Sequence, residues 1–364
     1  MRESRLYRIL LIAFLIVVSL SVLYLGIKTW NTSRPGLESK RRLHMVLQVD
    51  GSALREGEMA DALDRILEII RNRMDEFGVS EKLVQKQGGD RIVVELPWSQ
   101  DVGRGRALIG QTAKLEFKLL ETPESTATIL KKIDEVLTKV DTYAFVKEDK
   151  AQNETEKKGK ESQVAKDVFG EEKEGHKKGI FTQHLESYGP TTAGFWVTID
   201  EKPKVEFLLC QPQVTGVIPG DDEFAWSTRT EIFQGQEYWG LYLLKKRVEL
   251  SGKYLVDAKP RYNEYRKPEL QFTLTKQGGK IFAQVTGDNI DKPLAITLDG
   301  RVESAPIIRS KIRDSGIIEL GGAATIEDAT DLAIVLKAGS FPAPVKIIEI
   351  RVIDPSLGQD SVHT

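Results

Sequence analysis

The chain has 364 residues, enough for two or three domains, and its 40% hydrophobic and 29% charged residues are typical of a folded protein rather than a disordered chain or a multi-span channel. A formal net charge of −2 excludes a global basic field that would recruit nucleic acid. The single cysteine and four scattered histidines offer no disulfide and no metal-binding spacing, so we expect no metal and no cofactor.

The first apolar segment is residues 9–27, nineteen residues without a charge. This length nearly spans a hydrocarbon core of about 30 Å. Three arginines precede it, which places residues 1–8 in the cytoplasm as a short tail. A cleaved signal peptide is the alternative, but its apolar region is usually about 7–15 residues long. We therefore predict a single-pass anchor in the cell (inner) membrane, a linker at 28–42, and an extracytoplasmic, periplasmic body.

Residues 43–120 show a mixed α/β pattern. Apolar residues recur at three- and four-residue steps, which predicts an amphipathic helix ended by Gly78. Leu115, Phe117 and Leu119 alternate with charged residues, which predicts a strand with one buried and one solvated face. The predicted elements are strands at 43–49, 91–96 and 114–119 and a helix over 63–77.

Residues 121–268 have a different composition and are predicted to form a β-rich insertion, the head. Within them, 147–178 is rich in lysine and acidic residues of balanced charge, which is typical of a solvated loop. The rest of the zone is rich in aromatic residues. Cys210 follows an apolar run and is predicted to be a small buried residue. Strands are predicted at 194–199, 205–210 and 237–244.

Residues 269–350 return to an α/β pattern. Asp299-Gly300 between two apolar runs predicts a β-hairpin. Thr325 and Asp328 have the spacing of a capping box, and Gly339 would end that helix. The further predicted elements are strands at 294–298, 301–305, 316–320 and 345–350. Two α/β zones around one insertion predict a discontinuous base domain that carries the head.

Several blocks of sequence are similar to the SecD family, the protein-export membrane subunit of the Sec translocon. They are IRNRMDEFGV at 70–79, DRIVVELP at 90–97, LIGQTAKLEF at 108–117, LAITLDGRVESAP at 294–306 and LKAGSFPAP at 336–344. The resemblance covers the anchor and both base zones, and residues 351–364 resemble the stretch that leads to the family's second membrane helix. The chain therefore resembles the N-terminal part of the family, its first membrane helix and first large periplasmic domain.

The resemblance implies an α+β fold, in which one transmembrane helix is followed by a discontinuous ferredoxin-like base with an inserted β-rich head. It implies an accessory subunit of Sec-dependent protein translocation that captures or pulls preprotein on the trans side of the membrane. The implied partners are SecF, the SecYEG translocon, the translocating preprotein and the lipid bilayer, with no nucleic acid.

Two departures from the family limit what the resemblance implies. The family's G-L-D-L-x-G-G motif corresponds here to GLESKRR at 36–42, where an arginine pair replaces the glycine pair. The sequence leaves open whether that motif functions. The chain also reaches Thr364 without the family's later membrane helices, so no residue is assigned the proton-coupling role. Whether another chain supplies those helices stays open, as does the oligomeric state.

Six aromatic residues of the head are candidates for contacting preprotein, because exposed aromatic grooves bind extended polypeptide. They are Phe195, Trp196, Phe207, Trp226, Tyr238 and Trp239. The alternative is that they are core residues, which is common for aromatics in β domains. Candidate hinges are Pro123 and Pro268, where the chain enters and leaves the head.

We find no pattern of an enzyme. The acidic run at 221–223 lacks the spacing of a calcium loop and is interpreted as a polar turn. Two other hypotheses stay open beside translocation. One is a membrane-anchored extracytoplasmic adaptor or scaffold without translocation activity, and the other is a truncated SecD remnant.

Overall fold

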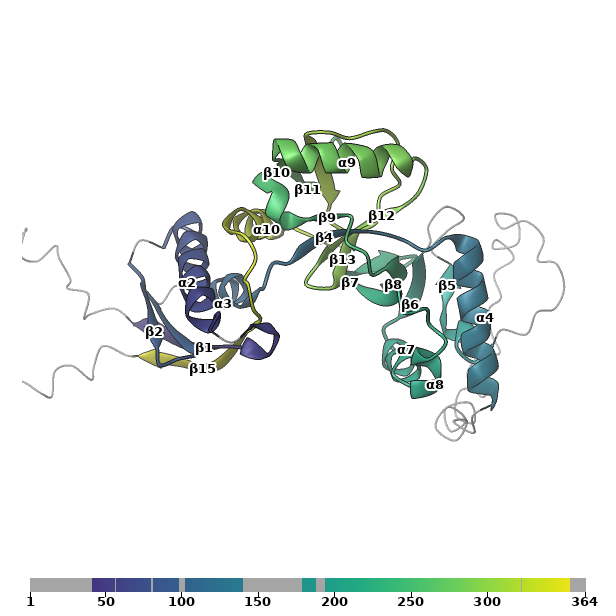
Figure 1. Ribbon diagram of the computed structural model, residues 1–364, viewed down its shortest axis with the longest axis horizontal. Coiled ribbons are helices and arrows are strands. Elements are labelled where there is room, and N and C mark those ends of the chain that lie inside the picture. The colour runs from purple at the N-terminus through teal and green to yellow at the C-terminus, as the bar shows by residue number, and fades with distance from the viewer. Residues whose placement is uncertain are drawn as a thin grey trace, which may run out of the picture.

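The computed structural model describes residues 41–353 apart from 56, 80, 98–101, 140–178, 188–193 and 322. The predicted membrane helix at 9–27 and the charged run at 147–178 lie outside the described residues. Among the residues described, no helix is long and apolar enough to cross a membrane. The fold is α+β, with several sheets distributed over three lobes (Figure 1). We call these the terminal lobe (42–110 and 345–353), the middle lobe (111–119 and 246–344) and the aromatic lobe (120–245).

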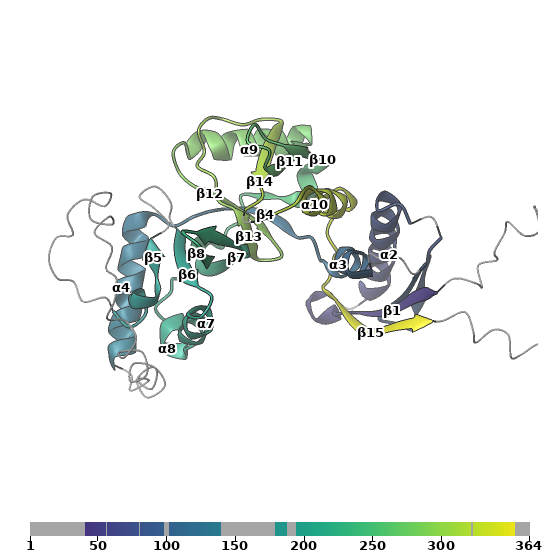
Figure 2. The same cartoon turned by 180° about the vertical axis from the view of Figure 1, so that it is seen from behind.

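The terminal lobe is one antiparallel sheet with strand order β15-β1-β3-β2. Two helices connect the strands in the β-α-β-β-α-β sequence of a ferredoxin-like fold, and the last strand returns from the far end of the chain (Figure 2). Its elements are β1 (Arg42–Val49), α2 (Met59–Glu76), β2 (Leu83–Gln87), β3 (Arg91–Pro97), α3 (Val102–Gly110) and β15 (Val345–Ile353).

The hydrophobic periodicity of the sequence explains why this lobe folds as it does. Alternate residues of β1, such as Met45 and Leu47, are buried against the apolar stripe of α2, which includes Ile66 and Ile70. Gly78 follows the helix with a φ of 85°, a left-handed conformation that favours glycine, so the predicted helix end is confirmed. Of the zone 269–350, only β15 joins this sheet.

Arg73 of α2 fastens the terminal lobe to the middle lobe. Its guanidinium is fully buried and donates hydrogen bonds to the carbonyl oxygens of Leu108 (2.8 Å) and Gly339 (3.0 Å) and to that of Gln111. It also lies 4.2 Å from the centre of the Phe341 ring. Burial lowers the pKa of Arg73 to about 10, so the group stays charged at neutral pH.

The middle lobe contains a second sheet, of order β10-β11-β14, with α10 packed against β10 and β11. Three phenylalanine rings, Phe117, Phe272 and Phe282, meet in its core with centroids 5.2–6.1 Å apart. Its elements are β4 (Leu115–Leu119), β9 (Leu250–Ser251), β10 (Leu255–Tyr262), β11 (Pro268–Leu274), α9 (Lys276–Asp288), β12 (Leu294–Leu298), β13 (Arg301–Ser304), β14 (Ser315–Glu319) and α10 (Ile326–Ala338).

Two local predictions in this lobe are confirmed. Asp299 and Gly300 have φ values of 50° and 80° and join β12 to β13 in a tight hairpin. Thr325 and Asp328 form a capping box at the start of α10, and Gly339 ends that helix with a φ of 89°. Residues 246–262, which the sequence places in the inserted head, lie here because β10 pairs along β11.

The aromatic lobe continues into the middle lobe through an eight-stranded sheet of order β5-β6-β8-β7-β13-β12-β4-β9. The two lobes are joined by a short parallel contact in which Val302 of β13 pairs with Ser227 of β7. Its elements are α4 (Pro123–Lys139), β5 (Glu186–Ser187), β6 (Gly194–Thr198), α7 (Lys202–Leu209), α8 (Pro212–Thr215), β7 (Asp222–Phe233) and β8 (Gln236–Lys245).

The structure contradicts three predictions for single segments. The strand predicted at 205–210 is the helix α7, because Pro203 occupies its first turn and apolar residues three apart, Val205 and Leu208, face the core. Cys210 caps that helix and is exposed, not buried. The strand predicted with one solvated face, β4, is buried on both faces.

Candidate functional site

The six candidate aromatic residues divide between the two faces of the β5-β6-β8-β7 sheet. The inner face packs on α4, α7 and α8, and its core includes Val197 of β6 and Leu241 of β8. Because strand side chains alternate, Phe195, Trp226 and Trp239 share that inner face. Trp196 and Tyr238 project to the opposite face, which we call the outer face.

On the inner face the aromatic residues have partners within the chain. The ammonium of Lys202 lies 5.0 Å from the Trp226 ring and 5.2 Å from the Trp239 ring. Phe195 and Trp226 pack on the core of the lobe. These three residues therefore match the core alternative of the sequence analysis, and so does Tyr238 on the outer face, which is only 7% exposed. Phe207 of α7 is 45% exposed and stands apart from both groups.

The outer face carries a strip of rings that runs along β8. Trp196 stacks on Tyr238 with centroids 5.1 Å apart and contacts Phe233 at 4.7 Å. Burial, then the nearby carboxylate of Glu186, raises the pKa of Tyr238. Phe233, at the tip of the β7-β8 hairpin, is 44% exposed and was not among the sequence candidates.

Two glycines allow the strip to continue to Tyr242. A Cβ atom built on Gly194 or on Gly240 would lie 2.7–2.8 Å from the Tyr242 ring, closer than any side chain permits. The ring therefore lies over the bare backbone of β6 and β8. The sequence could not show the role of these glycines, because Gly194 and Tyr242 lie on strands that are far apart in the chain and become neighbours only when the sheet forms.

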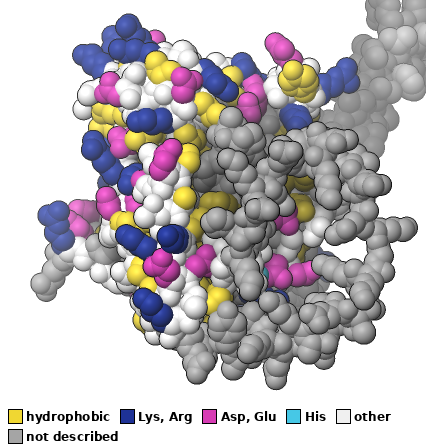
Figure 3. All heavy atoms as spheres, turned by 90° about the vertical axis from the view of Figure 1, so that its right-hand side faces the viewer, with side chains coloured by type: hydrophobic (Ala, Val, Ile, Leu, Met, Phe, Trp, Pro, Cys, Tyr) yellow, Lys and Arg dark blue, Asp and Glu magenta, His cyan; other side chains and the backbone are white. Residues whose placement is uncertain are grey.

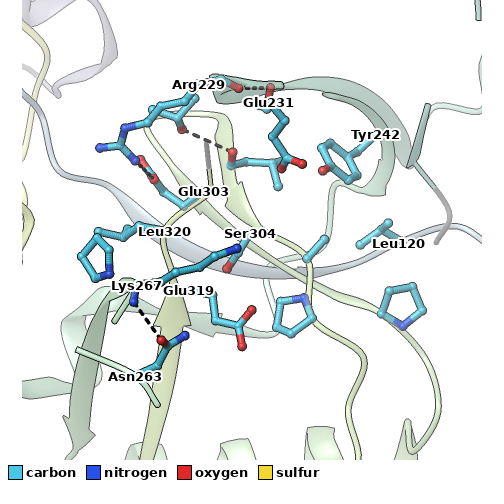
Figure 4. A pocket seen from close by; sticks show the side chains of 18 residues that line it. Leu120, Arg229, Glu231, Tyr242, Asn263, Lys267, Glu303, Ser304, Glu319 and Leu320 are labelled. Carbon is cyan, nitrogen blue, oxygen red and sulfur yellow. Dashed lines mark hydrogen bonds and ion pairs between the residues drawn. The ribbon is translucent and has the colours of Figure 1, made fainter. Parts of the chain in front are cut away.

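The strip ends at a cleft between the aromatic and middle lobes, with a volume of about 340 Å³ (Figure 4). Tyr242 and Glu231 reach it from the outer face of the sheet. Opposite them, Lys267 extends across the opening toward Ser304, and Glu319 points in from β14 (Figure 4). The cleft thus combines a ring, charges of both signs and hydroxyl groups, which suits the mixed side chains of a polypeptide.

One side of the cleft is fixed by an ion pair. The Arg229 guanidinium lies 3.1 Å from the Glu303 carboxylate, and only 3% of the Glu303 side chain is exposed. Ser227 accepts a hydrogen bond from the Gly240 N–H at 2.9 Å and donates one to the Arg229 carbonyl at 2.7 Å. These bonds hold the irregular part of β7 beside β13.

A cluster of charged residues lies where the chain passes between these lobes, and we call it the junction cluster. It consists of Glu116, Lys118, Glu121, Asp222, Glu223 and Lys245. Lys118 of β4 bridges Glu116 (3.1 Å) and Glu223 (2.8 Å), so two of the three charged residues of the predicted solvated face are buried in ion pairs and only Lys114 is exposed. The alternation pattern could not reveal this, because it does not show which other strand approaches.

The pKa values of the junction cluster differ in direction. Burial raises the pKa of Asp222, and the nearby Glu121 adds to this, so Lys245 does not restore its ordinary value. Burial also acts to raise the pKa of Glu121, but hydrogen bonds from Lys245 and Ser125 outweigh it and the net pKa is lowered. Lys245 is therefore shared by two carboxylates of unequal acidity.

The two candidate hinges occupy different settings. Pro123 is the first residue of α4. Two residues before it, Glu121 donates its N–H to the Leu243 carbonyl at 2.9 Å. Pro268 is the first residue of β11 and lies inside the β10-β11 hairpin of the middle lobe. Among the described residues, no group of three or more His, Cys, Asp or Glu is arranged to hold a metal ion.

Charge on the side of the aromatic lobe is mixed. Figure 3 shows Lys and Arg interspersed with Asp and Glu over the described part of that face, without a large field of one sign. A single-sign field is what steers nucleic acid or anionic lipid to a surface. This face therefore resembles an ordinary solvated surface.

Comparisons with known proteins place two parts of the chain. Residues 63–122 match the family model described as "Protein translocase subunit SecDF, P1 domain, N-terminal", and residues 228–343 match "SecDF, P1 head subdomain". The second match spans position 268, which the sequence analysis took as the end of the head.

Relatives match over most of this chain. It is 34% identical over 306 residues to protein translocase subunit SecD of Rhodothermus marinus, covering 83% of this chain and 48% of that protein. It is 31% identical over 343 residues to SecD of Elusimicrobium minutum, covering 93% and 57%. The chain thus spans about half the length of these curated relatives.

A solved structure agrees with these matches. The crystal structure of SecDF in its super-membrane-facing form is 28% identical, with a TM-score of 0.51, and the likeness covers 95% of this chain and 35% of that one. The similarity of fold therefore extends over nearly the whole described chain.

Proposed function

Because the chain belongs to the SecD/SecDF family through its P1 domain, we propose that it acts in Sec-dependent protein translocation, as an accessory subunit that captures preprotein on the trans side of the membrane. The proposed role is non-enzymatic. The observation that carries it is the contact of the exposed Phe233 with the partly exposed Trp196 on the outer face, together with the cleft between the lobes.

The chemistry of the strip suits an unfolded chain. Aromatic faces bind many kinds of apolar and cationic side chain without demanding one sequence. The adjoining cleft offers Lys267, Glu319 and Ser304 to polar groups. A translocating preprotein presents both kinds of side chain in an extended conformation, so one surface of this composition can hold many substrates weakly.

Binding is tested with the full chain in detergent and fluorescent reduced, carboxymethylated lactalbumin, a permanently unfolded protein. We expect binding, and we expect Phe233→Ala and Trp196→Ala to weaken it about three- to tenfold, the size of one lost aromatic contact. Folded lactalbumin with intact disulfides is the control. Absence of binding by the stably folded wild-type chain contradicts the proposal.

The proposed setting is a single-pass membrane protein with SecF and SecYEG as partners. The family's membrane association and the apolar run at 9–27 support it. Protease added to intact spheroplasts should digest the body and leave a short membrane-protected fragment. Full protection of the body under those conditions contradicts the topology. Co-purification with SecYEG after mild crosslinking tests the partnership.

A scaffold without capture activity is the second candidate. It is favoured by the inner face, where Trp226 and Trp239 are occupied by Lys202 of the same chain. A scaffold should co-purify with translocon components yet bind no unfolded lactalbumin. The two measurements together separate capture from scaffolding.

A further inference from the structure

The two edges of the β10-β11-β14 sheet differ. In the part of the chain that the structure describes, β14 forms a hydrogen-bonded ladder with β11 alone, and β13 approaches it without pairing. Edge strands present rows of N–H and C=O groups that can pair with another chain, and proteins usually protect them. The two outer edges of this sheet belong to β10 and β14.

The hydrogen-bond register between β11 and β14 shows which backbone N–H and C=O groups of β14 point away from β11. Leu274 donates its N–H to the Asp314 carbonyl at 2.8 Å, and the register continues from Thr273 opposite Ser315 to Glu269 opposite Glu319. In an antiparallel pair, hydrogen-bonded residues alternate with non-bonded ones. Even-numbered residues of β14 therefore bond to β11. The backbone groups of Ser315, Ile317 and Glu319 are directed to the unpaired edge.

The opposite edge carries a proline. Asn263 donates its N–H to the Lys267 carbonyl at 2.9 Å, which makes Arg261 opposite Glu269 a bonded pair and Pro260 opposite Leu270 a non-bonded one. The nitrogen of Pro260 thus faces the outer edge of β10 and has no hydrogen to donate. In addition, α10 packs against β10. The five residues of β14 include no proline.

Hollows adjoin both ends of the β14 edge. An apolar pocket of about 410 Å³, lined by Phe117, Phe272 and Phe282, touches Ser315, Gly316 and Ile317. The cleft of Figure 4 touches Glu319, Leu320 and Gly321. Pro306 borders both. The two hollows are thus about four residues apart along the strand, or roughly 13 Å.

We propose that the β14 edge is a docking edge for an extended polypeptide segment, which adds as a fourth strand to the β10-β11-β14 sheet. A large apolar side chain of the segment enters the pocket beside Ile317, and a polar side chain about four residues along faces Lys267 and Glu319 in the cleft. This inference rests on the proposed function and names the mode of capture. Main-chain pairing explains how one site accepts unrelated sequences, because every polypeptide carries the same backbone groups.

The first test copies onto β14 the protection that Pro260 gives β10. Ile317→Pro removes an outward N–H and leaves the bonds to β11 in place, because Ile317 belongs to a non-bonded pair. With the full chain and fluorescent unfolded lactalbumin, we expect binding to weaken about tenfold, the value of one to two lost hydrogen bonds. Ile317→Val keeps the N–H and an apolar side chain and should bind like wild type. Pro260→Ala should also leave binding unchanged.

The second test needs no substitution and does not depend on how the proline variant folds. Amide hydrogen exchange is followed in the wild-type chain with and without unfolded lactalbumin. We expect slower exchange at Ser315, Ile317 and Glu319 on binding. The amides of Gly316 and Ile318, already bonded to β11, should change little.

The outcomes separate the two proposals. No binding by the wild-type chain overturns capture itself. Binding that is unaffected by Ile317→Pro in a folded variant, without protection of the odd-numbered amides, overturns strand addition and leaves capture intact. Loss of a chain dimer in Ile317→Pro, with lactalbumin binding unchanged, shows that the edge pairs with a second copy and also overturns the inference.

Discussion

The terminal lobe and the aromatic lobe use their sheets differently. In the terminal lobe one face of the sheet lies on α2 and α3, and alternate apolar residues such as Met45 and Leu47 face the core. In the aromatic lobe both faces of β8 carry large rings, with Trp239 inward and Tyr238 outward. A sheet with only one apolar face is committed to its core. Of the outward rings, Tyr238 and Tyr242 are buried, so only Phe233 at the hairpin tip and the partly exposed Trp196 present apolar surface to another chain.

The lobes also differ in how they join the rest of the molecule. Arg104 of α3 forms a two-bond ion pair with Asp331 of α10, at 3.0 and 2.6 Å, and Arg73 adds its bonds across the same boundary. The aromatic lobe is joined by the junction cluster and the short β7-β13 contact. Charged side chains therefore contribute to both attachments, and the aromatic lobe is joined in addition through a buried apolar cluster that includes Tyr242 and Val302.

The largest expected loss of stability is at the attachment of the terminal lobe to the middle lobe. Arg73→Ala leaves three carbonyl groups without their donor and opens a cavity, so we expect the free energy of unfolding to fall by about 3–5 kcal/mol. Chemical denaturation measures it. Arg65→Ala on the exposed side of the same helix should change stability by less than about 0.5 kcal/mol. Equal effects of the two substitutions would show that Arg73 does not fasten the lobes.

The next effect separates the faces of the aromatic lobe. Trp239→Ala removes a half-buried ring and its contact with Lys202, so we expect a loss of about 2–3 kcal/mol of stability. Phe233→Ala, at the exposed hairpin tip, should cost less than about 1 kcal/mol. Thermal unfolding of both variants provides the comparison. A Phe233→Ala variant as unstable as Trp239→Ala would mean that the outer face is core.

Neutral substitutions of the two carboxylates that share Lys245 should change the free energy of unfolding by different amounts. Glu121→Gln removes a carboxylate that Lys245 stabilises. We expect the free energy of unfolding to fall by about 1–2 kcal/mol at pH 7. Asp222→Asn replaces a carboxylate whose ionised form is disfavoured by burial, so we expect a change within about 0.5 kcal/mol. Denaturation at pH 7 measures both. A larger loss for Asp222→Asn would reverse the assignment.

The pH dependence of stability follows from the same directions. The pKa of Glu121 is lowered, so its contribution is complete above the ordinary value of 4.5 and is lost as the pH falls through the folded-state pKa. The pKa of Asp222 is raised above 3.8, so its ionised form opposes folding at neutral pH and that cost disappears on acidification. The difference between Glu121→Gln and wild type should therefore stay nearly constant from pH 7 to pH 5 and shrink as the pH falls below 4.5.

The smallest effect concerns a turn that the sequence predicted. Gly300→Ala places a side chain at a φ of 80°, so we expect a loss of about 1 kcal/mol. Asp299→Asn tolerates the same left-handed region but loses one of the two hydrogen bonds that the carboxylate accepts from the Ala113 and Lys114 N–H groups, so we expect a similar loss of about 1 kcal/mol. Thermal unfolding measures both. A Gly300→Ala variant as stable as wild type would mean that the β12-β13 hairpin relaxes to another turn.

Helices, turns and caps were predicted correctly where neighbouring residues in the sequence determine the local structure. The helix over 63–77, the Asp299-Gly300 hairpin and the Thr325 capping box are all present. Segments whose environment is set by distant strands were not predictable. Lys118 is buried because Glu223 lies beside it, and Val205–Leu208 is helical because its apolar residues face α4.

The same limit applies to the candidate site. Aromatic composition pointed to the aromatic lobe, where Trp196 and Tyr238 stack on each other, and their contact with preprotein stays a prediction. It could not divide six rings between two faces, because that division depends on the register of β6 against β8. Phe233 and the edge of β14 were missed for the same reason. A strand lies at an edge when only one neighbour pairs with it, and the sequence of the strand itself does not show how many neighbours it has.

The return of β15 to β1 has a consequence for biosynthesis. Arg42, at the beginning of the described chain, pairs with Ile353 at its end, so the ribosome must make everything between them before this sheet can close. Closing a loop of that size is entropically costly and tends to be slow. Until then one edge of β1 has no strand paired to it, while the aromatic lobe can already form its core, which is separate from the cluster that contains β1. The first strand of this sheet to be synthesised is thus the one whose second edge is paired last.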